Sequence, residues 1–377
     1  MTKEQLFFIQ ILNDFINQKS SILLDNLDLD KLKYYAKIHE VSGIVFYQTK
    51  LEQFRSDYLF AIYSYTNRQE ITKELTDKFD FPWFVVKGLE VAKMYPIPEL
   101  RTMGDCDLVV HRENRETVHQ IMLNLNFENA TKYDDREWQY YKHNLEFEIH
   151  DKLIYSEVVN NSKQEMFFND FWKYVDGNEL DWNFHFLYLV AHLRKHFMNQ
   201  GSGIRPFMDL ALVVKSVDLD WEWIENSAQS IELMPFLKAT LAFCKRWFSI
   251  DSPISDDGFD DSFYMSSAEK IFDDGIFGFD NTDNSQSDIV NLMHNQGRQG
   301  VLKKLLKEFF PPYKSLISSE KYKFLKGRKY LLSYAWLYRL LSEKNKISSK
   351  INNIKKHYSV NENKVQAREE LYSKWGL

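Results

Sequence analysis

The chain contains two apolar runs with the pattern of buried strands, Phe84-Val85-Val86-Lys87-Gly88-Leu89 and, after a short linker, Arg101-Thr102-Met103-Gly104-Asp105-Cys106-Asp107-Leu108-Val109-Val110. Because successive side chains on a strand point to opposite faces, Asp105 and Asp107 are expected to lie side by side. Neighbouring carboxylates raise one another's pKa or require a cation, and Mg²⁺ with a substrate phosphate suits them. The pattern therefore predicts a metal site, with a solvated strand end as the alternative.

Helix and strand patterns on either side of these runs divide the chain into three parts. Residues 1–80 have apolar residues at helical spacing and are expected to form an N-terminal helical segment. Its helices are expected over residues 4–18, 30–48 and 58–79. Residues 81–176 carry the strand signals, and residues 177–377 are expected to be helical. The predicted fold is α+β, with a small mixed-sheet core flanked by N-terminal helices and a larger C-terminal all-helical domain.

A hairpin is expected over residues 138–149, because two short runs flank Lys142-His143-Asn144. In the second run, apolar residues alternate with Glu146, Glu148 and His150. The alternation can bring a third carboxylate, Glu148, to the face that carries the two aspartates. Glu146 competes for this role, and His150 is expected to be a supporting residue.

The composition is that of a folded protein, since 44% of the 377 residues are hydrophobic and 16% are aromatic. Cys106 and Cys244 lack the spacing of a zinc site or a disulfide framework, which indicates a reducing compartment. The N-terminus lacks the layout of a signal peptide, and no apolar run approaches the roughly 18 residues that span a bilayer. These features predict a cytoplasmic, soluble protein with no membrane partner.

The net charge of −6 is unevenly distributed. Residues 251–288 are rich in Asp, Ser and Gly, and a solvated acidic loop is expected there because the spacing of an EF-hand loop is absent. Residues 301–377 contain 18 Lys and Arg against 6 Asp and Glu, with aromatic residues interleaved. Such a surface can contact nucleic acid, but its leucines favour packed basic helices, so nucleic acid is not the favoured partner.

The central motifs resemble those of the nucleotidyltransferase superfamily, which has a small-residue turn after a strand, then Asp-x-Asp, then a third carboxylate on a later strand. The closest resemblance is to an uncharacterised bacterial branch, nucleotidyltransferase family five, in which Lys-Gly replaces the Gly-Ser of the turn. It covers about residues 80–215. It is carried by Val86-Lys87-Gly88, Tyr95-Pro96, Gly104-Asp105-Cys106-Asp107, Phe147-Glu148-Ile149-His150, Ala191-His192-Leu193-Arg194-Lys195-His196 and Arg205-Pro206-Phe207-Met208-Asp209-Leu210-Ala211.

This resemblance implies transfer of NMP from an NTP such as ATP, with two Mg²⁺ ions stabilising an in-line attack on the α-phosphorus. It implies that the catalytic residues and metal ligands are Asp105, Asp107 and Glu148. The residues that it places at the substrate are Lys87, Gly88, Arg101, His192 and Lys195. Within this set, Lys87 and Arg101 are expected to neutralise the triphosphate.

Some of these residues also have structural interpretations. Arg101 can simply pair with an aspartate, and Lys87 can be a surface lysine at a strand end. Arg205 and Asp209 have i, i+4 spacing and are expected to form a salt bridge. A catalytic role is not expected for this pair.

His192 and His196 lie four residues apart and can share one face of a helix. In His-Glu-x-x-His zinc sites a glutamate follows the first histidine, but Leu193 stands there in this chain. Zinc is therefore not expected, and His192 is either a substrate-orienting residue or a core histidine.

The acceptor of the implied transfer is open: a small molecule, a sugar intermediate, a protein side chain and a tRNA end are all compatible. The competing interpretation is a non-catalytic nucleotide- or nucleic-acid-binding module that retains the fold, as in a toxin–antitoxin system. The three carboxylates favour an enzyme. Leu89, where the superfamily has a small residue, favours caution about the phosphate-binding turn.

Overall fold

The computed structural model describes residues 1–129, 137–154, 161–199, 201–275, 310, 313, 316, 324–325, 327–342 and 369–377. The chain divides into two compact units, the first formed by Met1–Phe279 with Lys374–Leu377 and the second by Asp280–Ser373. The expected segment boundaries at residues 80 and 176 both fall within the first unit, and the three-part division stays a prediction. All residues of the predicted site belong to the first unit.

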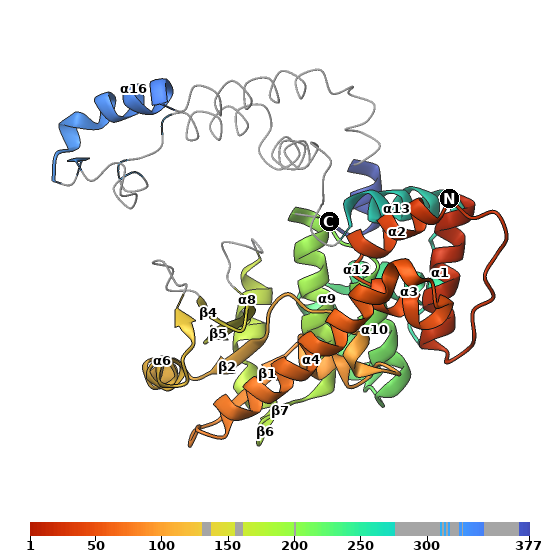
Figure 1. The fold of residues 1–377 in the computed structure, drawn as a ribbon, viewed down its shortest axis with the longest axis horizontal. Helices are drawn as coiled ribbons and strands as arrows, with labels where there is room; N and C mark the ends of the chain where they lie inside the picture. Colours follow the sequence, from red (N-terminus) through yellow and green to blue (C-terminus); the bar gives the residue numbers. More distant parts are fainter. Residues whose placement is uncertain are drawn as a thin grey trace. The chain divides into compact units, whose positions relative to one another are not determined.

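The first unit is built around a five-stranded mixed sheet (Figure 1). Its strands, in spatial order, are β1 (Trp83–Val86), β2 (Asp107–Val110), β5 (Leu145–His150), β4 (Glu137–Lys142) and β3 (Glu128–Asn129). β2 and β5 run parallel, and the other neighbours run antiparallel. Two short strands, β6 (Val175–Asp176) and β7 (Glu179–Leu180), form a separate ribbon. The mixed sheet and its surrounding helices confirm the predicted α+β fold.

The predicted hairpin is confirmed as β4 and β5, which pair antiparallel with Lys142 opposite Leu145. Its two-residue turn is formed by His143 and Asn144, whose φ angles of 52° and 62° are typical of a type I′ turn. In the parallel pair of β2 and β5, Asp107 lies opposite Glu148. The sheet therefore brings an aspartate and the third carboxylate together, as the alternation in the sequence indicated.

The two faces of the sheet have different partners. One face, with Leu108 and Phe147 at its centre, packs against α4 (Arg55–Thr76) and α6 (Arg115–Asn124) in one apolar core. The other face carries the acidic residues and borders a cavity, whose opposite wall includes α9 (Trp182–Asn199). The alternation of side chains along β2 thus separates the core from the candidate site.

The N-terminal segment is helical as predicted, with one difference. Its elements before α4 are α1 (Lys3–Ile16), α2 (Leu29–Ile38), α3 (Ser42–Thr49) and the 3₁₀ helix η1 (Glu52–Phe54). The single helix expected over residues 30–48 is wrong, because Glu40 adopts a left-handed conformation with φ of 54° that interrupts it. At this break, the Glu40 carbonyl accepts a hydrogen bond from Thr102, and its carboxylate pairs with Arg205. Contacts from distant residues therefore override the local helical pattern.

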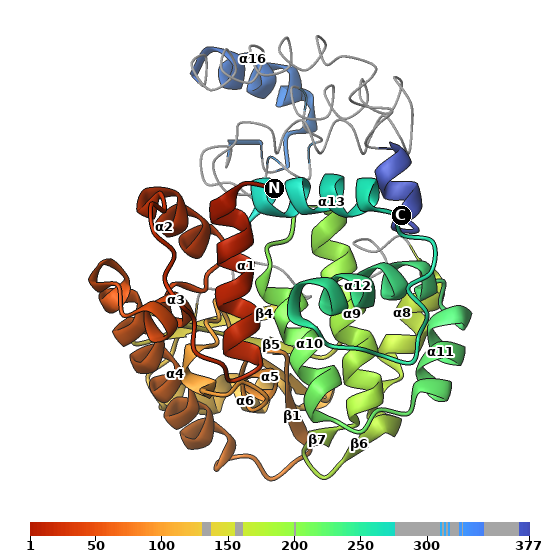
Figure 2. The ribbon, with the colours of Figure 1, turned by 90° about the vertical axis from the view of Figure 1, so that its right-hand side faces the viewer.

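The remaining helices of the first unit lie away from α4 (Figure 2). They are α8 (Ser162–Asn169), α9, α10 (Arg205–Ser216), α11 (Trp221–Ser230), α12 (Met234–Phe248) and α13 (Asp261–Asp274). Of these, α10 and α12 pack against α1. Shorter helices are α5 (Gly88–Ala92), η2 (Pro98–Leu100), η3 (Arg112–Asn114) and η4 (Phe171–Tyr174). Trp375 packs against the rings of Phe197 and Phe243, and its indole N–H donates to Ser267 Oγ at 2.9 Å. The last residues thereby complete the core of this helical part.

Part of the segment expected to be a solvated acidic loop is instead a helix. α13 covers Asp261–Asp274 and buries Phe263, Ile271 and Phe272, which recur at helical spacing. Asp260 caps the helix by accepting a hydrogen bond from the Phe263 N–H at 2.7 Å. Apolar spacing within an acidic sequence therefore determines the local structure. Residues 276–288 lie outside the described residues.

The second unit is described over a small part of the expected basic helices. α16 (Leu332–Ser342) follows the 3₁₀ helix η6 (Lys329–Leu331), and Ala335 packs with Leu316 and Leu325 in a small apolar cluster. Residues 289–309 and 343–368 lie outside the described residues.

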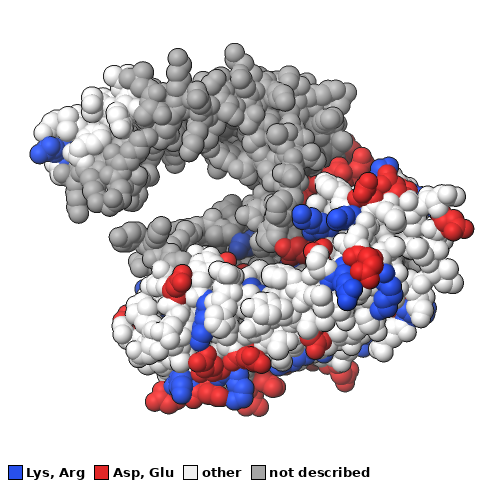
Figure 3. Space-filling model, viewed as in Figure 1, with Lys and Arg blue, Asp and Glu red and all other residues white. Residues whose placement is uncertain are grey.

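On the face of the first unit seen in Figure 3, acidic and basic side chains are intermixed. Among the described helices, none combines the length and the apolar character needed to cross a membrane.

Two histidines of the first unit are completely enclosed. His39 Nδ1 accepts a hydrogen bond from the Ile204 N–H at 3.3 Å, and His185 Nε2 accepts one from the Lys87 N–H at 3.1 Å. Burial lowers the pKa of each histidine to about 3, and neighbouring positive charges add to the effect at His185. Both side chains are therefore neutral at pH 7.

We expect the free energy of unfolding to fall as the pH is lowered from 7 to 5. Below the ordinary histidine pKa of about 6.5, the unfolded chain binds protons that the folded chain excludes, at a cost of about 1.4 kcal/mol per pH unit and histidine. The His39→Gln variant keeps an acceptor but lacks this titration, so its loss between pH 6.5 and 5 should be smaller by roughly 2 kcal/mol. Urea unfolding measures the difference, and equal losses in both proteins would contradict the prediction.

Candidate active site

A cavity of about 560 Å³ lies between the polar face of the sheet and the helices α9 and α10. Seven of the eight residues that the sequence predicts for the site line it, namely Lys87, Gly88, Arg101, Asp105, Glu148, His192 and Lys195. The eighth, Asp107, lies beneath the lining, with 1% of its side chain exposed. The fold thus gathers residues that are spread from the end of β1 to α9.

Asp107 is the first residue of β2 and is buried against two cationic partners. Its Oδ1 lies 2.6 Å from Lys87 Nζ and 3.1 Å from His150 Nε2. Burial alone would raise the pKa of Asp107, but Lys87 and His150 outweigh burial and hold the pKa well below its ordinary value. The other oxygen, Oδ2, is buried and has no hydrogen-bond partner in the described part of the chain. Asp107 is therefore an ionised carboxylate with one oxygen left unpaired.

Glu148 faces Asp107 across the parallel strands and shares His150 with it. Glu148 Oε2 lies 3.2 Å from His150 Nε2, and Glu148 Oε1 accepts a hydrogen bond from Gln139 at 3.0 Å. Burial would lower the pKa of His150, but its hydrogen bonds to both carboxylates raise it to about 9. Burial would raise the pKa of Glu148, but the hydrogen bond from His150 lowers it. An imidazolium thus links two carboxylates.

The group formed by Asp107, Glu148 and His150 can hold a metal ion. Each residue offers one ligand atom, and the three atoms lie within 4.8 Å of one another. The residues fit a divalent cation, because the unpaired Asp107 Oδ2 is a buried oxygen that such an ion satisfies. His150 would bind the ion as a neutral imidazole, after release of its proton.

Asp105 does not share a strand with Asp107, contrary to the prediction. β2 begins at Asp107, so Asp105 belongs to the preceding loop, where it lines the cavity. The charge of Asp107, followed by burial, raises the pKa of Asp105. In the group of three ligands found among the described residues, His150 stands where Asp105 was expected. The role of Asp105 as a metal ligand stays a prediction.

Lys87 joins β1 to α5 in an uncommon backbone conformation, with φ of 56° and ψ of −119°. This conformation is strained for a residue that has a side chain. Its N–H is bound by His185, and its ammonium is directed at Asp107. At the next position, a Cβ on Gly88 would lie 3.3 Å from Met103 Sδ, so close packing favours glycine there.

Arg101 is bound to an aspartate from far along the chain. Its Nε and Nη2 donate to the two oxygens of Asp209 at 2.9 and 2.8 Å, and the Tyr95 hydroxyl donates to the same carboxylate at 2.7 Å. The expected pair of Arg205 with Asp209 is therefore wrong, because the buried guanidinium of Arg101 binds Asp209 in a two-pronged geometry. Nε and Nη2 of Arg101 are thus engaged by Asp209, so Nη1 is the nitrogen of Arg101 that could make the predicted contact with phosphate.

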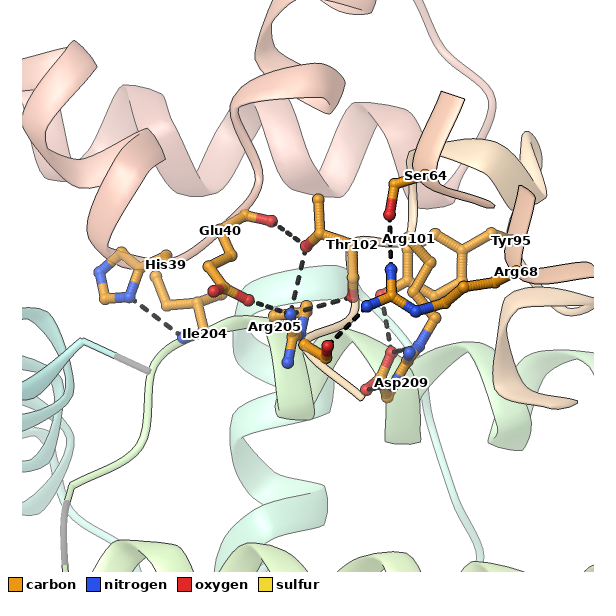
Figure 4. Close-up of polar contacts among 11 residues, drawn as sticks. His39, Glu40, Ser64, Arg68, Tyr95, Arg101, Thr102, Ile204, Arg205 and Asp209 are labelled. Atoms are coloured by element: carbon orange, nitrogen blue, oxygen red, sulfur yellow. Dashed lines mark hydrogen bonds and ion pairs between the residues drawn. The ribbon is translucent and has the colours of Figure 1, made fainter. Parts of the chain in front are cut away.

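The loop before Asp105 is held from α4. Arg68 donates to the Gly104 carbonyl at 2.5 Å and to Ser64 Oγ at 2.5 Å, and its side chain is buried (Figure 4). The carbonyl that Arg68 binds belongs to the residue directly before Asp105. The N-terminal helical segment therefore fixes the position of a predicted site residue.

The same loop is also held by the break between α2 and α3 and by the start of α10. Thr102 donates to the Glu40 carbonyl at 2.5 Å, and Arg205 donates to the Thr102 carbonyl at 2.9 Å (Figure 4). Arg205 also pairs with the Glu40 carboxylate. Three elements that are distant in sequence thus meet at this loop.

α9 supplies the wall opposite the carboxylates through Tyr188, His192, Lys195 and His196. His192 Nε2 lies 3.2 Å from His196 Nε2. Burial, followed by the charge of Lys87, lowers the pKa of His192 well below its ordinary value. Sequence reasoning missed His185, although its i, i+3, i+7 spacing with Tyr188 and His192 marks the same face of the helix.

Replacement of Arg68 by methionine should loosen the loop that carries Asp105. The methionine keeps apolar packing but cannot bind the Gly104 carbonyl, so we expect a loss of about 2 kcal/mol in the free energy of unfolding. Binding of Mn²⁺ should weaken by about tenfold, as when a supporting residue of a metal site is removed. Urea unfolding and Mn²⁺ titration measure both effects, with Arg55→Met at the exposed start of α4 as the control. Unchanged Mn²⁺ affinity in Arg68→Met would show that the loop does not serve the metal site.

The match with known proteins extends beyond the cavity. The chain matches the family described as "Uncharacterised nucleotidyltransferase" over residues 25–249, which include α2 to α12 and the whole sheet. No curated protein and no solved structure matches it. The match spans more than half of the chain and is wider than the residues 80–215 expected from the motifs. The chain therefore belongs to this family of uncharacterised nucleotidyltransferases.

Proposed function

We propose that the chain is a metal-dependent transferase that moves NMP from an NTP, for example ATP, to an acceptor hydroxyl or phosphate. The observation that carries this proposal is the unpaired Oδ2 of Asp107 beside Glu148, beneath a cavity large enough for a ligand. A buried, ionised carboxylate oxygen is costly unless a donor or a cation binds it. Membership of the family supports the reaction type.

Mg²⁺ is the proposed cation, with Asp107 and Glu148 as its ligands and Asp105 as a further carboxylate on the cavity side. When bound, it would stabilise the attacking and leaving oxygens of an in-line displacement at the α-phosphorus. Glu148 lines the cavity, where its carboxylate can orient the acceptor group. Asp107 is held in place by Lys87 and His150, which both line the cavity.

The opposite wall is proposed to bind the substrates. Lys195 supplies positive charge for phosphates, and His192, which is neutral, supplies a hydrogen-bonding group. Arg101 Nη1 lies 3.9 Å from the position of a Cβ on Gly88, so this nitrogen is the part of Arg101 proposed to reach the triphosphate. The acceptor is proposed by class alone, as a small molecule, a sugar intermediate, a protein or a tRNA. The free, buried Cys106 and Cys244 fit the proposed cytoplasmic location.

Incubation of the protein with Mg²⁺ and each α-labelled NTP should transfer label to one of the acceptors: a panel of small hydroxyl compounds, total tRNA or the protein itself. Glu148→Gln and Asp105→Asn should each lower the rate by roughly a thousandfold, because several kcal/mol of transition-state stabilisation are lost. Glu146→Gln is the matched control, since Glu146 lies on the same strand and lines the same cavity but is not among the three candidate ligands. Its rate should stay within about tenfold of wild type.

Two outcomes would contradict this proposal. If Glu148→Gln kept the wild-type rate while Glu146→Gln lost it, the third carboxylate would be Glu146. If the folded protein showed no label transfer and no Mg²⁺-dependent nucleotide binding, the chain would be a non-catalytic module that retains the fold. Circular dichroism of each variant separates a lost rate from lost folding.

A further inference from the structure

The carboxylate cluster already contains a cation that the chain itself supplies. Lys87 Nζ donates to Asp107 Oδ1 at 2.6 Å, and 15% of the Lys87 side chain is exposed against 1% for Asp107. The ammonium thus contacts the same buried oxygen that His150 contacts at 3.1 Å. The ion pair is therefore a fixed part of the site.

The backbone of Lys87 has a strained conformation that indicates a role for its side chain. Glycine adopts φ of 56° and ψ of −119° without strain, whereas a residue with a side chain pays roughly 1–3 kcal/mol for such a conformation. The surrounding structure holds the turn through the hydrogen bond from the Lys87 N–H to His185 Nε2 at 3.1 Å. His185 is in turn fixed by stacking on Trp182, with ring centroids 4.8 Å apart. The strain is maintained at a position whose side chain reaches Asp107, so the ammonium is the feature that the position provides.

The donor atoms leave room for one further cation. Oδ1 of Asp107 contacts both Lys87 and His150, and Oδ2 is the oxygen without a partner. In the described part of the chain, one group of three residues can hold an ion, and it consists of Asp107, Glu148 and His150. A second ion that bridged to Oδ1 would have to displace the Lys87 ammonium at 2.6 Å.

We propose that the ammonium of Lys87 takes the place of one of the two metal ions expected at this site, so that the chain binds a single divalent ion together with its nucleotide. The part of this inference that concerns nucleotide binding rests on the proposed function. Lys87 thus acts at the carboxylates and not at the triphosphate, which differs from the role expected from the sequence. Its ammonium is part of the chain, whereas a metal ion exchanges with solvent.

Counting of bound Mn²⁺ tests this inference directly. We would titrate the full chain with Mn²⁺ and count the free ion by electron paramagnetic resonance, with and without a non-hydrolysable α,β-methylene NTP. Wild type should bind one Mn²⁺ per chain in the presence of the analogue. Lys87→Gly, in which the turn is unstrained and Oδ1 of Asp107 is released, should bind two. Without the analogue, Lys87→Gly should bind its first Mn²⁺ at least about tenfold more tightly than wild type.

Lys93→Met is the matched control, because it removes a half-exposed positive charge at the end of α5, outside the cavity lining, without touching the pair of Lys87 and Asp107. It should still bind one Mn²⁺, with affinity changed by less than about threefold. Two ions in the wild type, or a single ion of unchanged affinity in Lys87→Gly, would overturn the inference. The wild-type count decides the matter even if Lys87→Gly fails to fold.

The failure of this inference differs from the failure of the proposed function. If the wild type bound two Mn²⁺ with the analogue and transferred label, the proposed function would stand and the role of Lys87 would be wrong. If no analogue bound, the proposed function would fail. The affinities of wild type and Lys87→Gly for Mn²⁺ without the analogue would then still test the role of Lys87.

Discussion

The buried ion pair between Lys87 and Asp107 is the contact on which the arrangement of the site depends. It connects the turn after β1 to the first residue of β2, and through the Lys87 backbone it connects both to His185 of α9. Loss of one member of a buried ion pair typically costs about 3–5 kcal/mol, although Asp107 would still keep its contact with His150. The sheet and α9 are therefore held in a fixed relative position at the carboxylate side of the cavity.

A second buried ion pair also joins the connection after β1 to the helical part. Arg101 and Tyr95, from the connection between β1 and β2, bind Asp209 of α10. Arg68 and Arg205 hold the residues that follow Arg101, so the loop before Asp105 is positioned by both helical regions. The family match likewise extends beyond the sheet, from near α2 to α12.

The sequence predicted what depends on neighbours in the chain. The strand runs and the hairpin around Lys142-His143-Asn144 follow from local alternation and turn chemistry, whereas the register that sets Glu148 opposite Asp107 joins strands that are distant in the sequence. The partner of Asp209 could not be predicted, because the local i, i+4 rule favours Arg205, whereas the observed partner, Arg101, lies 108 residues away. The helix break at Glu40 could not be predicted for the same reason. Glu40 contacts Thr102 and Arg205, which are distant in the sequence, and local periodicity gives no information about such contacts.

These buried charges contribute to the geometry of the site more than to the stability of the fold. Removal of two charges from water costs nearly as much as their attraction returns, so pairs such as Arg101 with Asp209 contribute little net stability compared with apolar residues of the same shape. What they provide is geometry, since a two-pronged guanidinium contact or a 2.6 Å ammonium contact tolerates little displacement. Asp107 gives the clearest case: Lys87 and His150 fix Oδ1 and keep the carboxylate ionised, while Oδ2 is left unpaired. A core built for stability alone would pair both oxygens, so the single free oxygen is the feature that points from the fold to the chemistry.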